Sequence, residues 1–238
     1  MDVAELVAEI DAELRAQGSP ERAVQERAYL KSRLDHYGVG VPAVRAVAGR
    51  VASRRPPLER GDLLALVEGL WAGTVYERRR VAVDLLERCG ERLLPADSGL
   101  LERLLRDSQT WALVDELAAN VAGPLVERHP GLGAVLDGWA ADGDFWIRRS
   151  ALLALLVPLR RGDGDFPRFT RYADAMLEER EFFIRKAIGW VLRDTARRRP
   201  DLVCAWLLPR VGRVSGVTLR EALKPLSPAQ RATLLAAR

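Results

Sequence analysis

The chain has few of the residue types that build metal sites, disulfide frameworks and membrane spans. Its two cysteines, Cys89 and Cys204, lie far apart in apolar helical contexts, and we expect both to be buried free thiols. Its two histidines, His36 and His129, have no partner at a metal-ligand spacing such as HExxH. We therefore expect no metal and no cofactor. No segment approaches about 18 uncharged apolar residues, which excludes a membrane-spanning helix.

Lysine is also scarce. It occurs as Lys31, Lys186 and Lys224, so nearly all of the positive charge comes from arginine. The net charge is +4 and the isoelectric point is near 9.4. One interpretation is the codon usage of a GC-rich genome. The other is phosphate binding, because the planar guanidinium group matches the geometry of that anion. Composition permits nucleic-acid binding and does not decide between the two.

The overall composition is that of a folded soluble protein, with 48% hydrophobic and 29% charged residues. A length of 238 residues fits one large domain or two small ones. The N-terminal stretch MDVAELVAEIDAELRAQG is acidic and amphipathic, and it has neither the basic start nor the apolar block of a signal peptide. We therefore expect a cytoplasmic protein.

Apolar residues recur at helical spacing nearly everywhere, and no period-two alternation bounded by turn residues is present in the sequence. Segments of about 12 to 20 residues, the usual length of globular helices, lie between breaks rich in glycine and proline. The breaks fall at residues 18–20, 38–42, 55–57, 94–95, 129–131, 162–164 and 199–200. The pattern predicts an all-α protein.

Four of the expected helices repeat a common pattern, with an aromatic residue in second place. They are VYERRRVAVDLL from Val75, TWALVDELAANV from Thr110, FWIRRSALLALL from Phe145 and FFIRKAIGWVLR from Phe182. The aromatic residues, Tyr76, Trp111, Trp146 and Phe183, follow one another at intervals of 35, 35 and 37 residues. Another amphipathic helix precedes each of them.

A helical hairpin that repeats with this period is typical of an α-solenoid, and the sequence shows no TPR consensus. We therefore predict HEAT-like repeats whose second helices line a concave DNA-binding groove. The predicted organisation is a single domain over residues 1–238, with N-terminal helices in 1–55 and repeats over about 60–238.

The second helices share a stripe of charged and aromatic side chains. Counted from each aromatic residue as position 0, one helix face contains positions 0, 3, 4 and 7. This face gathers Arg79, Asp115, Arg149 and Lys186 beside the aromatic residues. The alternatives are aromatic residues packed in the core and a structural salt bridge between Asp115 and Arg149. Arg148 and Arg185, one place off the stripe, have the pattern of solvated charges.

The stripe has the composition of a groove for a polyanion. Arginine and lysine on a solenoid wall can hold a phosphate backbone largely without reading sequence, and indole faces can receive a cation, a sugar or a base. A lone carboxylate repels phosphate, so Asp115 has no obvious use in binding. It has a use in chemistry that builds positive charge on a sugar carbon, where it stabilises the transition state and positions water.

Three segments carry a family resemblance: TWALVD (110–115), FWIRR (145–149) and EFFIRKAIGWVLRD (181–194). They resemble the AlkD-type DNA alkylation-repair glycosylases, HEAT-like-repeat enzymes that excise alkylated purines. The resemblance extends through AYLKSRLDHYGVGVPAVRAV from Ala28 and GLWAGTVYERRRVAVDLL from Gly69, and so covers most of the chain.

The resemblance implies site residues. Trp111 and Asp115 match the tryptophan and acid of the family, Arg149 the arginine of the next repeat, and Trp190 the tryptophan of the repeat after that. These residues are implied to line the cleft, where the acid acts on the deoxyribose and the attacking water. Further DNA contacts are implied at Tyr29 and in the loop 38–42, which includes Gly40 and Pro42. Family members are implied to work without flipping the base.

The chain departs from the family pattern at three positions. Thr110 and Ala112 stand where many relatives carry a second tryptophan and an extra acid, and Gly40 stands where others place a polar side chain. A smaller and less polar cleft edge suggests room for a large hydrophobic adduct. One hypothesis is therefore a self-resistance enzyme that acts on lesions of a DNA-alkylating natural product.

We predict a monofunctional DNA glycosylase that hydrolyses the N-glycosidic bond of N3- or N7-alkylated purines in duplex DNA. Asp115, Trp111, Trp190 and Arg149 are the expected catalytic set. The expected DNA contacts are Tyr29, Gly40, Pro42, Arg79, Arg148, Arg185 and Lys186. The protein is expected to be a monomer, associated with the nucleoid of a bacterium. A lyase activity is not expected, because Lys186 is the one lysine on the stripe and the family does not use it as a nucleophile.

Two rival interpretations remain open. The first is a non-catalytic solenoid that binds DNA or a protein, since solenoids are most often binding scaffolds. The second is a pure scaffold in which Asp115 and Arg149 form a structural pair. Salt-sensitive duplex binding separates the DNA-binding interpretations from the scaffold, and base release separates the enzyme from the binder.

Overall fold

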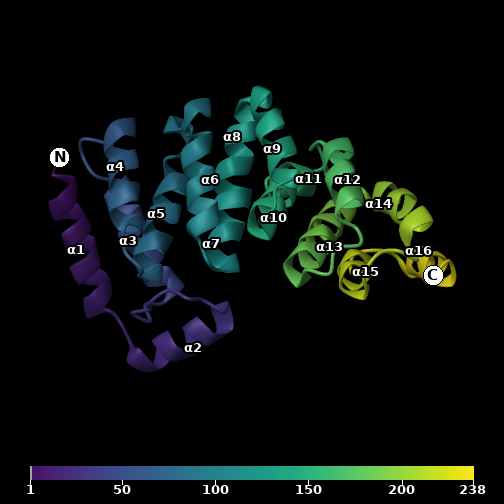
Figure 1. Cartoon of the computed structure of the whole chain (residues 1–238), viewed down its shortest axis with the longest axis horizontal. Helices are drawn as coiled ribbons and strands as arrows, with labels where there is room; N and C mark the ends of the chain where they lie inside the picture. Colours follow the sequence, from purple (N-terminus) through teal and green to yellow (C-terminus); the bar gives the residue numbers. More distant parts are fainter. Residues whose placement is uncertain (1) are drawn as a thin grey trace. The chain divides into compact units, whose positions relative to one another are not determined.

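The computed structural model describes residues 2–238, and the regular elements of this range are all helices (Figure 1). One isolated bridge joins Asp35 to Val75. The prediction of an all-α helical-repeat fold is confirmed. None of the helices in the described part of the chain is long and apolar enough to cross a bilayer. The chain divides into two compact units, Met1–Leu117 and Ala118–Arg238, and the single-domain organisation stays a prediction.

The first unit consists of helical hairpins and one projecting helix. Its helices are α1 (Val3–Ala16), α2 (Pro20–Leu30), α3 (Val41–Ala52), α4 (Arg60–Trp71), α5 (Tyr76–Arg88), α6 (Ser98–Asp107) and α7 (Trp111–Glu116), with short 3-10 turns η1 (Gly90–Arg92) and η2 (Pro95–Asp97). Helices α4 and α5 form an antiparallel hairpin, and α3 and α7 pack against α5. Three second helices therefore lie side by side in this unit, with α5 in the middle (Figure 1).

A π-helix, η3 (Leu117–Ala122), begins at the last residue of the first unit and leads into the second. The helices of the second unit are α8 (Gly123–Arg128), α9 (Gly133–Ala140), α10 (Phe145–Leu153), α11 (Leu156–Arg161), α12 (Phe166–Ala175), α13 (Phe182–Ala196), α14 (Pro200–Leu207), α15 (Gly216–Leu223) and α16 (Pro228–Ala236), with 3-10 turns η4 (Pro130–Leu132) and η5 (Leu208–Arg210). Helix α13 packs against both α10 and α15, so these three second helices form the equivalent layer.

Side-chain caps fix where the aromatic-led helices begin. The Asp144 carboxylate accepts a hydrogen bond from the Trp146 backbone N–H at 2.8 Å, and the Glu181 carboxylate accepts one from the Phe183 N–H at 3.1 Å. An acceptor at the N-cap satisfies one of the orphan donors of the first turn and stabilises the helix by about 1 kcal/mol. Because both caps directly precede the helix, they place the aromatic residues of α10 and α13 in the first turn.

Helices α13 and α15 approach each other closely at Gly189. A Cβ atom at this position would lie 2.9 Å from Cβ of Glu221 and 3.0 Å from Cα of Thr218. The second contact is with backbone, which cannot rotate away as a flexible side chain can. Glycine therefore sets the distance between the two helices, and with it the position of Glu221 relative to α13.

Gly189→Ala is expected to lower the free energy of unfolding by up to about 2.5 kcal/mol. Overpacking costs about 1 to 3 kcal/mol, and the better helix propensity of alanine returns about 0.5 to 1 kcal/mol. Chemical denaturation measures the change. The control is Gly138→Ala in α9, where a Cβ meets nothing within 4 Å and a stability gain is expected. An equal gain at both positions contradicts the close approach.

Candidate functional site

Helix α7 carries the candidate acid and the first candidate tryptophan. Trp111 opens the helix and is partly exposed, and Asp115 follows one turn later with 8% of its surface exposed. Thr110 precedes them and is itself buried. Its hydroxyl donates a hydrogen bond at 3.0 Å to the Leu30 carbonyl, at the end of α2. The start of α7 is therefore tied to the end of α2.

Tyr29 lies beside Trp111. The two rings meet edge to face, with centroids 5.7 Å apart and planes at 79°. Tyr29 is nevertheless 73% exposed, because α2 projects from the rest of the first unit and buries mainly Leu30 (Figure 1). An exposed aromatic ring that is held by a second ring is available to contact a ligand.

The loop before α3 is anchored by one buried carboxylate, Glu77. Its oxygens accept hydrogen bonds from the backbone N–H groups of Tyr37 (3.1 Å), Gly38 (2.7 Å) and Val39 (3.1 Å). Gly38 takes a positive φ of 79°, a conformation that glycine adopts without strain. Gly40 then forms the N-cap of α3, and Pro42 lies exposed in its first turn. The candidate DNA-contacting loop thus has a rigid base.

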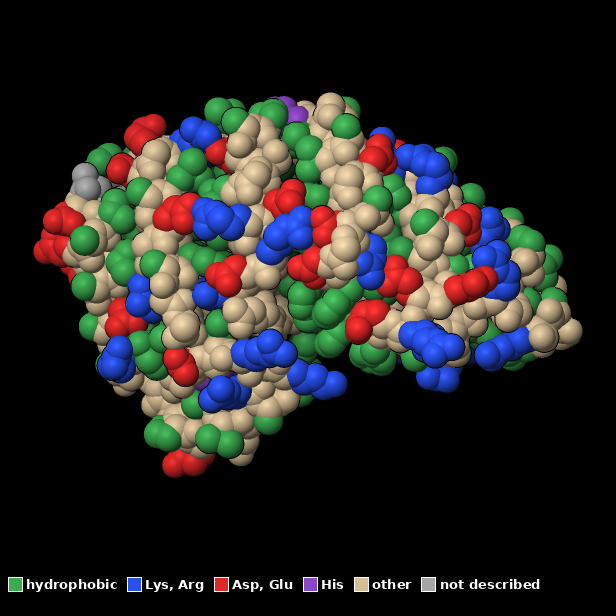
Figure 2. Space-filling model, in the orientation of Figure 1, with side chains coloured by type: hydrophobic (Ala, Val, Ile, Leu, Met, Phe, Trp, Pro, Cys, Tyr) green, Lys and Arg blue, Asp and Glu red, His purple; other side chains and the backbone are tan. Residues whose placement is uncertain are grey.

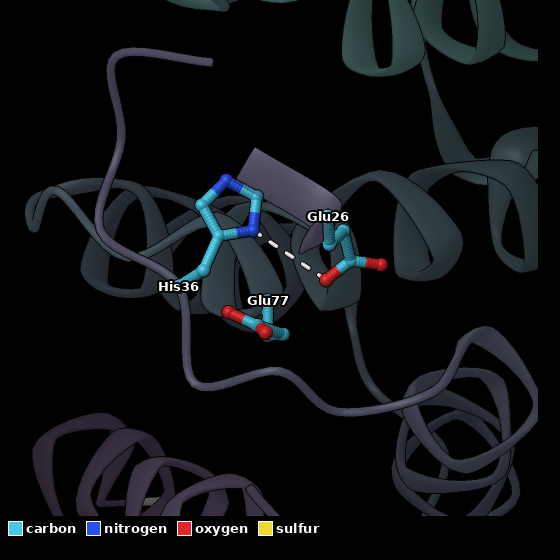
Figure 3. A group of neighbouring side chains, drawn as sticks. All are labelled: Glu26, His36 and Glu77. Carbon is cyan, nitrogen blue, oxygen red and sulfur yellow. Dashed lines mark hydrogen bonds and ion pairs between the residues drawn. The ribbon is translucent and has the colours of Figure 1, made fainter. Parts of the chain in front are cut away.

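Glu26, His36 and Glu77 form a cluster with the residue types of a metal site (Figure 3). Nδ1 of His36 lies 3.4 Å from Oε2 of Glu26, and the imidazole ring stacks on Tyr76 with centroids 4.7 Å apart. Both oxygens of Glu77 already accept backbone N–H groups. These contacts join α2, the loop before α3 and α5, and they make the cluster an anchor for the loop.

Arg79 on α5 contacts the protein interior. Its guanidinium donates to the carbonyls of Gly73 and Asp107, pairs with the Asp107 carboxylate at 3.0 Å, and lies 5.0 Å from the ring centroid of Trp71. The residue is 5% exposed. Burial lowers the pKa of Arg79, and Asp107 opposes this effect. The predicted DNA contact of Arg79 has no support in this geometry, which gives it a structural role.

Its neighbour Arg80 is equally buried and holds the carboxylate next to the candidate acid. Arg80 pairs with Asp84 at 3.2 Å and with Glu116 at 3.1 Å. Glu116 directly follows Asp115 on α7. The end of α7 is therefore fixed to α5 by an ion pair with a buried arginine.

In the second unit, aromatic rings gather at the starts of α10 and α13. Trp146 lies 4.4 Å from Phe145 and 4.8 Å from Phe183, measured between ring centroids. Arg149 is 2% exposed, lies 5.7 Å from the Phe183 ring centroid, and donates a hydrogen bond to the Phe183 carbonyl. Arg149 thus links the second turn of α10 to the first turn of α13.

The two arginines one place off the stripe also bind the protein, contrary to the pattern of solvated charges. Arg148 donates to both oxygens of Glu179 at 2.9 and 2.8 Å, and this bond raises the pKa of Arg148. Arg185 donates to the Glu179 carbonyl at 2.7 Å. Both side chains are partly exposed, so each still presents charge to a ligand.

Helix α13 carries Lys186 and Trp190 one turn apart. The Lys186 ammonium pairs with Glu221 of α15. The indole N–H of Trp190 donates to Asp194 at 3.2 Å, and the ring is partly exposed. Asp194 itself is 4% exposed and also binds Arg160 and Arg193. Trp190 is therefore held by a carboxylate one turn further along the same helix.

The structure thus brings together Tyr29, Trp111 and Asp115 within the first unit, and it places Trp190 and Lys186 on one face of α13 within the second. The supporting carboxylates Glu77, Asp194 and Glu221 were missed in the sequence. The partners of Glu77 are backbone groups 38 to 40 residues away, and those of Glu221 include Arg193 and Lys186 at 28 and 35 residues. The nearer partners, Trp190 and Arg193 for Asp194 and Lys224 for Glu221, do not by themselves indicate that these carboxylates are buried. On the face shown in Figure 2, cationic and acidic side chains are interspersed, in agreement with these ion pairs.

The described residues thus form a helical-repeat protein in which a shielded carboxylate and partly exposed indole rings lie on the second helices. The family model described as DNA alkylation repair enzyme matches residues 10–226, and the chain belongs to this family.

Among solved structures, a predicted DNA alkylation repair enzyme from Enterococcus faecalis shares the fold. Its TM-score is 0.80 at 24% identity, and the match covers 89% of this chain and 98% of that one. No protein with a curated description matches the chain.

Glu77→Gln is expected to lower the free energy of unfolding by about 1 to 3 kcal/mol, because the amide group points N–H donors at backbone N–H groups that need an acceptor. Hydrogen exchange of the amides of residues 37–39 should accelerate more than that of the α5 core. The control is Glu9→Gln, which alters an exposed carboxylate 3.8 Å from Arg54. Unchanged exchange in the loop contradicts the anchoring role.

Acid is expected to destabilise the second unit through Glu221. Burial alone raises the pKa of this carboxyl, but hydrogen bonds from Lys186 and Lys224 outweigh it and lower the pKa to about 2 from 4.5. A lowered pKa contributes stability above pH 4.5 that is lost as the pH falls towards 2. Unfolding free energies measured against pH should therefore fall more steeply for the wild type than for Glu221→Gln.

The control for that comparison is Glu178→Gln, because Glu178 pairs with Arg213 on the surface and both side chains are more than half exposed. This variant should follow the wild type. Identical slopes for all three proteins contradict the assignment to Glu221.

Proposed function

We propose that the protein is a monofunctional DNA glycosylase that removes cationic N3- or N7-alkylated purines from duplex DNA without flipping the base. Membership of the DNA alkylation repair enzyme family supports a role in DNA repair. The single observation that carries the finer proposal is the arrangement on α7, where a carboxylate with 8% exposure follows one turn after a partly exposed indole. A carboxylate in this position, beside a ring that can hold a cationic base, is suited to stabilise positive charge that develops on the sugar.

The chemistry requires little from the protein. Alkylation at N3 or N7 gives the purine a positive charge, so cleavage of the bond to C1′ returns the electron pair to the ring and releases a neutral base. Positive charge develops on the deoxyribose at the same time. The Asp115 carboxylate stabilises this charge, and a water that it orients attacks C1′ and transfers a proton to it.

The aromatic residues hold the cationic nucleotide. Trp111 and Tyr29 offer a ring pair beside Asp115, and Trp190 offers a second indole. A cation over an indole face is stabilised by about 0.5 to 2 kcal/mol. A methylated purine loses its charge on release, so this contact favours the lesion over the product and over normal bases.

Cationic side chains contact the phosphate backbone of the DNA. In this proposal the partly exposed Arg148, Arg185 and Lys186 contact phosphates beside the lesion. Arg149, which is 2% exposed, holds the first turn of α13 in place behind them. Tyr29, Gly40 and Pro42 contact the DNA from α2 and the loop before α3. Phosphate contacts of this kind position the duplex and do not read its sequence.

A preference for bulky adducts, and with it a role in self-resistance, remains a secondary hypothesis. Thr110 and Ala112 are buried, so neither widens the edge of a cleft. Gly40 is the remaining support, because it is partly exposed at the start of α3 and has no side chain there. Comparison of base release from a methylated and a bulky substrate decides between generalist and specialist.

Asp115→Asn is expected to reduce base release from duplex DNA containing N7-methylguanine by about 100-fold or more, because an amide does not stabilise positive charge on the sugar. Duplex affinity should change by less than about threefold, since the carboxylate contributes nothing to phosphate binding. Single-turnover release of free base and fluorescence anisotropy measure the two effects.

The control is Asp62→Asn on α4, a helix that carries none of the candidate residues. A variant Asp115→Asn with wild-type release rates overturns the catalytic assignment. Salt-sensitive duplex binding with no release by the wild type shows a non-catalytic DNA-binding protein instead.

A further inference from the structure

The stripe on α13 continues beyond Trp190. Arg193 and Arg197 follow at three and seven residues, which places them on the same face of the helix as the indole. Both arginines line a cavity of about 320 Å³, together with Lys224 and Pro225, which follow α15. All four residues belong to the second unit. None of them belongs to the catalytic set or the DNA contacts expected from the sequence.

A buried carboxylate, that of Glu221, lies behind this cavity and holds its cationic side chains. Glu221 is 6% exposed and pairs with Arg193, with Lys224 at 2.8 Å, and with Lys186. Asp194, 4% exposed, pairs with Arg193 at 3.1 Å. Cations that lie next to one another repel, so a shared carboxylate is needed to hold them in place. Glu221 thereby fixes Lys224 and Arg193 as a preorganised cationic wall.

Arg197 completes the cavity from its exposed edge. Among residues 2–238, no hydrogen bond or ion pair holds its guanidinium, whereas Arg193 and Lys224 each have a carboxylate partner. The cavity therefore combines two fixed cations with one uncommitted guanidinium fork. Such a fork binds phosphate through two parallel N–H···O bonds.

We propose that this cavity binds a phosphate group of the DNA strand next to the lesion. The proposal rests on the proposed function for the identity of the strand. A helix rises 1.5 Å per residue, so Arg193 and Arg197 lie about 4.5 and 10.5 Å beyond Trp190 along α13. Successive nucleotides of a strand are about 3.4 Å apart along the duplex axis. The cavity therefore lies no further from the indole contact than the span of about three nucleotides.

Arg197→Ala tests the proposal in the full-length protein. Affinity for unmodified duplex DNA is measured by fluorescence anisotropy at several salt concentrations. Loss of one phosphate contact should flatten the slope of log K against log salt by about 0.9 and weaken binding by roughly tenfold at low salt. The matched control is Arg198→Ala, an exposed neighbour in the turn after α13 that does not line the cavity and should keep the wild-type slope.

An equal slope for Arg197→Ala and Arg198→Ala overturns the proposal. Titration of inorganic phosphate, followed by calorimetry, tests the other source of the same chemistry. If Arg197→Ala abolishes phosphate binding and leaves the duplex slope unchanged, the cavity is a site for a small phosphate compound and the DNA assignment is wrong.

Base release from duplex DNA containing N7-methylguanine separates this proposal from the proposed function. Absence of release by the wild type, with a flatter slope for Arg197→Ala, leaves the phosphate site standing and removes the glycosylase. Release by the wild type, with an unchanged slope for Arg197→Ala, supports the glycosylase and removes the phosphate site.

Discussion

Contacts made by buried charged side chains between neighbouring second helices are the constraint on which the rest of this structure depends. Arg80 on α5 pairs with Glu116 of α7, and Glu221 on α15 pairs with Arg193 of α13. Arg149 on α10 donates a hydrogen bond to a backbone carbonyl of α13. A buried charge is tolerated only when it is paired and hydrogen-bonded, and loss of one partner costs several kcal/mol. These contacts therefore specify how each helix is set against the next, and they tolerate little change in spacing, as the close approach at Gly189 illustrates.

The same constraint decides which cations remain for a ligand. Most arginines of the repeats are occupied by carboxylates or carbonyls, as for Arg79, so a high arginine content does not by itself make a binding surface. Under the proposed phosphate site, the cations available to a polyanion are those that a buried acid holds at the surface, such as Lys224, or those without an acid, such as Arg197. The cations that an acid holds lose little side-chain freedom on binding.

Much of the fold was predictable, because apolar spacing and the interval of 35 to 37 residues report helices and their repetition directly. The face of a helix is also readable, and it placed Trp190 and Lys186 on one stripe. The position of a residue within the repeat does not predict how deeply its side chain is buried. Arg79 and Lys186 occupy equivalent positions, yet Arg79 is 5% exposed and the Lys186 side chain is 39% exposed. The role of Glu77 could not be predicted either, because it binds backbone N–H groups 38 to 40 residues away.

The proposed chemistry is compatible with the scarcity of histidine and cysteine, because it needs no general acid from the protein. A neutral leaving group would need protonation, and a histidine that titrates near pH 7 is the usual donor. An alkylated purine brings its own positive charge, so departure needs no acid from the protein. What remains is to stabilise charge on the sugar and supply water, for which one carboxylate suffices. The proposed site therefore needs aromatic rings and cations beside Asp115 rather than histidine or cysteine, and the chain has two of each of the latter.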